Sequence, residues 1–91
     1  MCTAIAERTE FTGSAKGRTG WFSVGHLYVG YDHPAHVDLE HAVLLDFVDE
    51  TREGARVAVE LPRDAARDLV ARLQRALDAA DAYEAAAAAS T

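Results

Sequence analysis

The chain has 91 residues and a formal net charge of −6 at pH 7. This length fits one small domain, and the acidic charge argues against nucleic acids or anionic membranes as partners, because both bind cationic side chains. No apolar run approaches the ~20 residues of a membrane span, and the N-terminus lacks a signal pattern, so we expect a cytoplasmic protein.

The size of the chain limits its hydrophobic core. A domain this small buries only ~60% of the surface that its unfolded chain exposes, so its core needs reinforcement. Cys2 is the only cysteine in the sequence, which excludes a disulfide within the chain. A bound metal, a partner subunit or an unusually well-packed core therefore remains as the expected reinforcement.

Four segments have the apolar pattern of β-strands: residues 3–12, 21–32, 42–48 and 56–61. In the second segment, Gly25 and Gly30 predict a bulge or a close approach of another backbone. The third segment is nearly continuous in apolar character, which is typical of a strand covered on both faces. The third and fourth segments, joined by a charged turn, predict a hairpin.

Residues 13–20 carry glycines at Gly13, Gly17 and Gly20 and predict a mobile loop between the first two strands. Such a loop resembles a phosphate-binding loop, but Gly17 stands after Lys16 where a nucleotide-binding loop has Ser or Thr. We therefore expect no nucleotide cofactor. The alternatives are a plain hairpin loop and a loop that offers Lys16 and Arg18 to an anionic group of a substrate.

One helix is predicted from Pro62 to about Tyr83. Its apolar residues recur at spacings of three and four and form one stripe: Ala66, Leu69, Val70, Leu73, Ala76 and Leu77. On the other face, Asp64–Arg67 and Asp68–Arg72 are spaced for ion pairs. Residues 1–83 thus form a single α+β domain, and residues 84–91 are an alanine-rich tail that is either helical or frayed.

The predicted fold is a four-stranded antiparallel sheet followed by one C-terminal amphipathic helix, in the order ββββα. One helix covers one face of such a sheet, while the third strand has apolar residues for both faces. A second layer is therefore needed. A homodimer packed through the other sheet face supplies it, and a ligand cavity is the alternative.

Histidines and carboxylates are concentrated between the second and third predicted strands. His33, His36 and His41 lie there, His26 lies just upstream, and Asp32, Asp38 and Glu40 accompany them. Imidazole is a common ligand of divalent metals, so zinc, copper, iron or manganese is a candidate cofactor. His33 and His41 are the leading metal ligands, with His26, His36 and Cys2 behind them. Acid–base chemistry, substrate binding and a purely structural role remain alternatives.

Asp46 is the one carboxylate inside the apolar third strand. By alternation it shares a face with Leu44 and Val48, which places it in the interior or at the rim of a cavity. A buried carboxylate needs partners, and Asp46 with His26 or His41 would make an acid–base pair. The alternative is an edge position that faces solvent.

The motifs of the chain resemble those of a family of short bacterial proteins of unknown function. The resemblance rests on residues 1–8, Gly13-Ser14 with Lys16-Gly17, Gly20-Trp21-Phe22, Tyr31-Asp32-His33-Pro34, Glu40-His41-Ala42 and Asp46-Phe47-Val48. It implies no activity. Because His26 and His36 lie outside these motifs, the resemblance favours a pair of His33 and His41 with carboxylates over a larger histidine cluster.

We expect a small enzyme of specialised metabolism that acts on a small organic molecule by isomerisation, cyclisation or hydrolysis, with or without a metal. The predicted catalytic residues are His33, His41, Glu40 and Asp46. The predicted substrate-binding residues are Lys16, Arg18, Trp21, Tyr31 and Asp32. The rival interpretations are a non-catalytic protein that binds a small molecule or a metal, and an assembly protein that docks through its helix.

Overall fold

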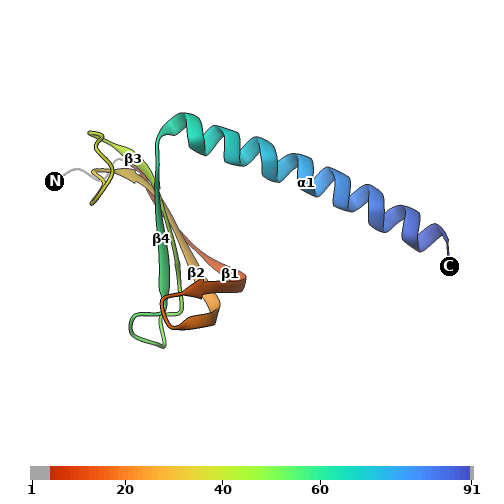
Figure 1. The fold of residues 1–91 in the computed structure, drawn as a ribbon, viewed down its shortest axis with the longest axis horizontal. Coiled ribbons are helices and arrows are strands. Elements are labelled where there is room, and N and C mark those ends of the chain that lie inside the picture. The colour runs from red at the N-terminus through yellow and green to blue at the C-terminus, as the bar shows by residue number, and fades with distance from the viewer. Residues whose placement is uncertain (1–4, 91) are drawn as a thin grey trace.

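The computed structural model describes residues 5–90, and its elements follow the predicted ββββα order. The strands are β1 (Ile5–Gly17), β2 (Gly20–Asp32), β3 (Ala42–Val48) and β4 (Arg56–Leu61), and the helix is α1 (Arg63–Ala89). All three strand pairs are antiparallel, in the spatial order β1-β2-β3-β4 (Figure 1). The predicted fold class is confirmed, and the predicted bounds of the third strand match those of β3.

The strand register separates polar from apolar side chains. Tyr28 pairs with Arg8 on one side and with Asp46 on the other, so the three share one face, which we call the polar face. The polar side chains on this face are those of Arg8, His26, Tyr28, Asp46, Arg56 and Glu60. The opposite side is the apolar face, formed by Leu27, Val29, Tyr31, Val43, Leu45, Phe47, Val57, Val59 and Leu61.

The glycine-rich segment is part of a strand, and the predicted loop over residues 13–20 is wrong. β1 continues through Gly17, which pairs with Gly20 across a tight turn at Arg18 and Thr19. Gly20 has a φ of +125°, a value that an L-side chain rarely adopts. Here glycine serves the hairpin turn and the ladder continues on both sides of it.

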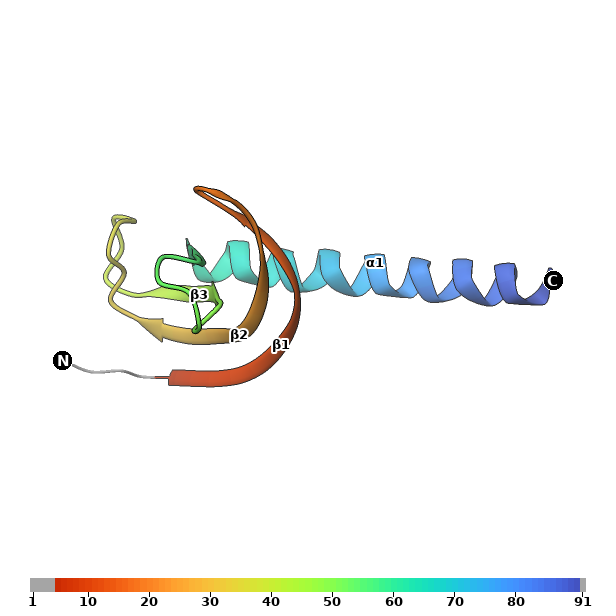
Figure 2. The ribbon, with the colours of Figure 1, turned by 90° about the horizontal axis from the view of Figure 1, so that it is seen from below.

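A bulge interrupts the pairing of β1 with β2. Glu10 pairs with His26 and Gly13 with Val24, so two residues of β1 face Gly25 alone. Gly25 thus marks the irregularity that the sequence predicted, whereas Gly30 pairs regularly with Ala6 and Leu44. Bulges increase local twist, and beyond this point β1 and β2 curve out of the plane of the sheet (Figure 2).

The described residues hold few buried side chains. Phe22 and Val24 are 6% exposed and Ala42 is fully buried, and these are the buried apolar side chains of residues 6–90. Phe22 lies against Gly17, where an added Cβ would come within 3.2 Å of the ring. The side chains of the apolar face are only half-buried.

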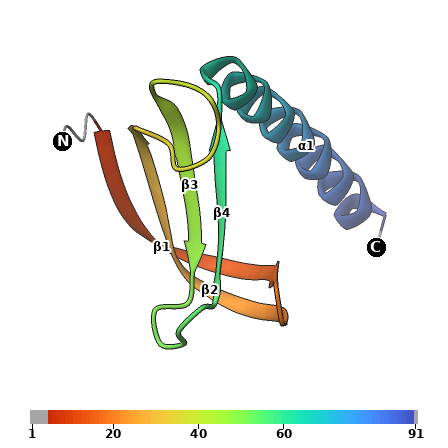
Figure 3. The same ribbon diagram turned by 60° about the vertical axis from the view of Figure 1, so that its left-hand side comes forward.

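The helix starts at the end of β4 and leaves the sheet (Figures 1 and 3). Pro62 is the N-cap residue, one position before the first helical turn where it was expected. The predicted ion pairs are present, with Asp64–Arg67 at 2.8 Å and Asp68–Arg72 at 3.4 Å. The helix continues through the alanine-rich tail to Ala89, as the high helix propensity of alanine favours.

The expectation that this helix covers a sheet face is wrong for the single chain. Its stripe is exposed, with Leu69 at 39%, Val70 at 67%, Leu73 at 54% and Leu77 at 57%.

Within residues 5–90, no helix combines the length and the apolar character that crossing a bilayer requires.

Two glycine substitutions should change stability in opposite directions. Gly54, in the β3–β4 turn, has a φ of +80° with open space around it, so Gly54→Ala strains only the backbone. We expect it to lower the free energy of unfolding by about 1 kcal/mol, or Tm by about 4–8 °C. Gly25 is not among the positive-φ glycines, and an added Cβ meets only the Val48 carbonyl oxygen at 4.0 Å.

Gly25→Ala is therefore the matched control, and it should leave stability unchanged or raise it slightly, because alanine restricts the unfolded chain. Urea unfolding at one fixed protein concentration measures both variants. Equal losses in the two variants would contradict the assignment of the strain to the Gly54 turn.

Candidate functional site

The connection between β2 and β3 brings His33 and His41 together. Their rings stack at 4.6 Å between centroids with an angle of 28° between the planes. His41 also stacks on Tyr31, at 5.6 Å and the same angle. The pairing of Asp32 with Ala42 closes the connection directly behind both histidines. The structure thus assembles Tyr31, His33 and His41, which the sequence analysis had assigned to one site.

The backbone around His33 fixes the orientation of its ring. Nδ1 lies 2.9 Å from the Glu40 carbonyl oxygen, and the Glu40 carboxylate lies 3.6 Å from the same nitrogen. A carbonyl oxygen can only accept, so Nδ1 carries the proton and Nε2 carries the lone pair of the neutral ring. Asp32 accepts a hydrogen bond from the His33 amide at 2.7 Å. Glu40 and Asp32 therefore position His33.

Glu60 holds the rest of this connection in place from β4. Its carboxylate accepts hydrogen bonds from three successive amides, of Ala35 at 2.6 Å and of His36 and Val37 at 2.9 Å. The bonds from Val37 and Ala35 keep the pKa of the Glu60 carboxyl below its ordinary value, because they favour the charged form. These three hydrogen bonds hold residues 35–37 over the polar face.

Asp46 lies on the polar face with Arg56 as its partner. The guanidinium of Arg56 reaches both carboxylate oxygens, at 2.6 and 3.2 Å. The Asp46 side chain is 25% exposed and therefore half-buried, which is typical of a residue at the rim of a cavity. The expected acid–base pair of Asp46 with His26 or His41 is absent among the described contacts, since a bidentate arginine pair occupies this carboxylate.

His26 belongs to a second polar cluster, centred on Glu50. The Glu50 carboxylate accepts hydrogen bonds from Arg8, at 2.6 Å, and from the Tyr28 hydroxyl, and it lies 2.9 Å from Nδ1 of His26. The bonds from Arg8 and Tyr28 lower the pKa of Glu50. This cluster ties β1 and β2 to the β3–β4 turn, so the structure separates His26 from the His33–His41 pair.

A groove of about 430 Å³ runs over the polar face. Its floor is apolar and includes Gly30, Leu44 and Ala58 from three neighbouring strands. Its polar lining residues are Glu7, Tyr28, Asp32, His33, Asp46, Arg56 and Glu60. Small-molecule sites typically combine ~300–1,000 Å³ with an apolar lining and a few polar groups, and this groove has both properties. His33 is the histidine that lines it.

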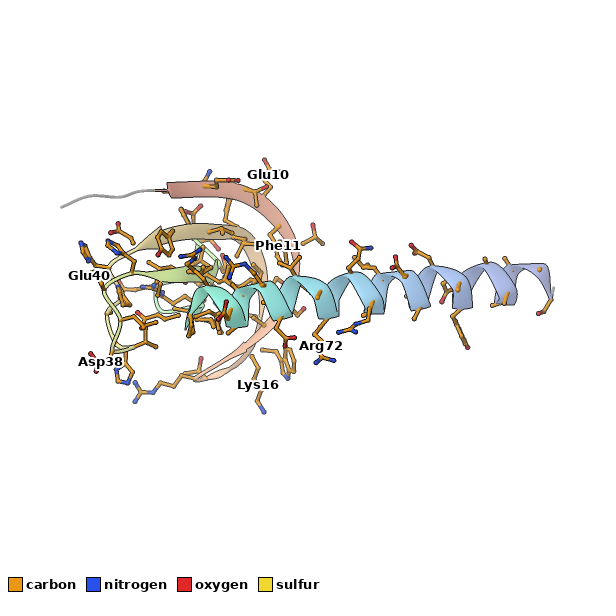
Figure 4. All side chains as sticks on the ribbon, turned by 90° about the horizontal axis from the view of Figure 1, so that it is seen from above. Glu10, Phe11, Lys16, Asp38, Glu40 and Arg72 are labelled. Carbon is orange, nitrogen blue, oxygen red and sulfur yellow. The ribbon has the colours of Figure 1, made fainter. Side chains whose placement is uncertain are left out.

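Lys16, Arg18 and Trp21 lie at the other end of the sheet. They surround the β1–β2 turn, whereas His33 follows the far end of β2, a strand of 13 residues or roughly 40 Å of chain. Figure 4 shows Lys16 well apart from Glu40. A hollow beside this turn is shared with Arg52 and Gly54 of the β3–β4 turn. Within one chain, these three residues therefore do not reach a molecule bound at His33.

The described residues hold no group of three or more His, Cys, Asp or Glu side chains arranged for a metal ion. The described hydrogen bond of His36 is made by its backbone amide, which donates to the Glu60 carboxylate. Cys2 lies outside the described residues. A metal on His33 and His41 stays a prediction.

The sequence analysis missed Glu60, Arg56 and Glu50. Alternation along β4 puts Glu60 and Arg56 on the face opposite Val57 and Val59, which identifies them as polar-face residues. The register that aims Glu60 at the loop amides and Arg56 at Asp46 depends on three-dimensional pairing, which alternation alone does not specify.

The Glu60 contacts generate a pH-dependent prediction. Because the folded-state pKa of Glu60 is depressed, its contribution to stability is fully present above the unfolded-state pKa of about 4.3 and is lost as pH falls through the folded value. Glu60→Gln removes the charge, so stability should depend less on pH in this window, and the amides of Ala35, His36 and Val37 should exchange faster with solvent.

Amide hydrogen exchange and urea unfolding measure the two effects. Both are followed from about pH 3 to 7, a range that includes the titration of carboxyl groups. Glu53→Gln, in the β3–β4 turn, removes the same charge away from the loop and is the control. Unchanged exchange at residues 35–37 in Glu60→Gln would show that the carboxylate does not hold the loop.

Comparison with known proteins gives a family and no activity. Neither a curated protein nor a solved structure matches the chain. One family, described as a family of unknown function (DUF6295), matches residues 1–87. This match spans the sheet, the histidine connection and most of the helix. The chain is therefore a member of the DUF6295 family of unknown function.

Proposed function

We propose that the protein binds a small organic molecule in the groove on its polar face and transfers a proton on it through His33. One observation carries the proposal: His33 lines the groove while the Glu40 carbonyl oxygen holds its Nδ1 proton. This tautomer leaves the lone pair on Nε2, the state required of a general base. Isomerisation, cyclisation and hydrolysis are the reaction classes that such a base serves.

The neighbouring residues have supporting roles in this proposal. His41 stacks between Tyr31 and His33, which restricts the orientation of the His33 ring. Asp46 remains paired with Arg56, so this pair presents a fixed dipole to the ligand. The apolar floor at Gly30, Leu44 and Ala58 fits a molecule that is apolar on one side and polar where it meets His33.

A non-catalytic binding protein, with a small molecule or a divalent metal at the same place, is the second candidate. The observation that favours it is the groove itself, whose apolar floor and polar lining suffice for binding without catalysis. Elemental analysis of protein purified without chelator or nickel resin separates this candidate from metal-free acid–base chemistry.

Proton transfer is testable without a known substrate. Enolisable ketones and small esters in heavy water serve as a panel, and proton NMR follows carbon-bound deuterium incorporation and ester hydrolysis. We expect at least one compound to react faster with the protein than in buffer, and His33→Gln to remove at least ~90% of this excess rate, because a general base contributes ~10²–10⁴-fold.

His36→Gln is the matched control, since His36 acts through its backbone amide and the substitution leaves that bond to Glu60 in place. Amide NMR spectra with the reacting compound should show shifts at Gly30, Leu44 and Arg56. Equal loss of rate in both histidine variants, or shifts confined to the β1–β2 turn, would contradict the assignment of the reaction to this groove.

A further inference from the structure

The single chain exposes more surface than a compact protein of its mass. Its accessible surface is 7,089 Å², whereas about 5,200 Å² is typical for a folded monomer of 9.8 kDa. The five residues outside the described range account for at most about 750 Å² of this surplus, even at the exposure of an unfolded chain. The radius of gyration is 16.2 Å, against about 12 Å for a compact domain of this length.

The surplus has an apolar character and a defined location. The helix stripe (Leu69, Val70, Leu73, Leu77 and Tyr83) is exposed over its whole length, with Tyr83 at 71%. The apolar face of the sheet is half-buried, and Phe11, which packs edge-on against Phe47 at 5.6 Å, is 37% exposed. Exposed apolar surfaces of this kind mark sites of association.

The helix does not bring its own stripe onto its own sheet. A hollow of about 350 Å³, lined by Val43, Ala66 and Val70, separates the start of the helix from β3. Beyond this hollow the helix runs away from the sheet (Figure 3). A 27-residue helix is a rod of roughly 40 Å, so most of the stripe lies beyond the reach of the sheet from which it starts.

We propose that a second copy of this chain covers both surfaces, with the stripe of each copy packed on the apolar face of the other. Every copy carries one stripe and one apolar face, which meets the requirement of a two-fold interface that the same patch be self-complementary. A surplus of about 1,150–1,900 Å² per copy corresponds to a total of about 2,300–3,800 Å² buried, within the ~2,000–5,000 Å² of obligate homodimers.

Charge does not oppose this arrangement. The stripe is bordered by residues of both signs, among them the paired Asp64 and Arg67 and the paired Asp68 and Arg72, so the helix does not bring a single-sign row of charges to the sheet of the other copy. The polar clusters around Glu50, Glu60 and Asp46 lie on the opposite side of the sheet and keep their partners in the dimer. The groove thus lies outside the proposed interface, whereas Tyr31, which stacks on His41, lies on the apolar face that the other copy covers.

The mass of the full chain in solution is the first test. Sedimentation equilibrium across the micromolar range should give twice 9.8 kDa for the wild type. Leu73→Glu puts a carboxylate in the centre of the stripe and should raise the dimer dissociation constant at least ~100-fold, because a buried charge without a partner is costly. Ala71→Glu adds the same charge on the opposite side of the helix and should remain dimeric.

A monomeric wild type, or a Leu73→Glu variant that dimerises like the wild type, would overturn the proposal. A second measurement does not depend on the folding of a variant with an added charge. A photoreactive phenylalanine at position 77, in a co-refolded mixture of isotopically heavy and light chains, should cross-link to strands β2, β3 or β4 of the other isotope. Cross-links found only within one isotope would show that the helix folds back on its own sheet.

Discussion

The pairing of β2 with β3 is the constraint on which the rest of the structure depends. This ladder runs from His26↔Val48 to Asp32↔Ala42 without interruption. A shift by one residue would exchange the two faces of the sheet, because side chains alternate along a strand. The last pair of this ladder, Asp32 with Ala42, also fixes the two ends of the connection that carries His33 and His41. The separation of faces and the position of the site therefore have one origin.

The polar face is stabilised by carboxylates that each have several partners. Glu60 accepts three amides, Glu50 binds groups from three other residues, and Asp46 forms a two-point contact with Arg56. Each joins segments that are distant in the sequence. None of these acidic groups lies in a dry interior, so they orient the loop and strands more than they supply net stability. They leave an open groove whose floor is formed by small and apolar residues.

The order of the elements was predictable because local patterns determine it. Alternation in residues 3–12, 21–32 and 56–61, the apolar run at 42–48 and the stripe after Pro62 were sufficient for the ββββα fold. The glycine-rich segment was mispredicted, because three glycines are as compatible with a paired hairpin as with a mobile loop, and only the opposing strand decides between them. The path of the helix was beyond sequence reasoning, since an apolar stripe does not specify which surface it meets.

For the site, sequence reasoning found the segment and part of the geometry. His33, His41, Glu40, Tyr31 and Asp32 meet because all belong to one short connection. Asp46 was correctly placed on a cavity-lining face, but its partner Arg56 comes from the neighbouring strand, and the register that joins them is not visible in the sequence. Lys16, Arg18 and Trp21 were grouped with the histidines by residue chemistry, whereas the length of β2 keeps them apart.

The strand order has a consequence for how the chain folds. Each strand pairs only with its neighbours in the sequence, through a tight turn or a short connection, so the sheet requires no long-range loop closure. Topologies dominated by such local contacts have small entropic barriers and fold rapidly. The helix makes few contacts with this sheet, so its apolar stripe contributes little to that step. Sheet formation should therefore be a first-order process, and the burial of the stripe in the proposed dimer a slower, concentration-dependent one.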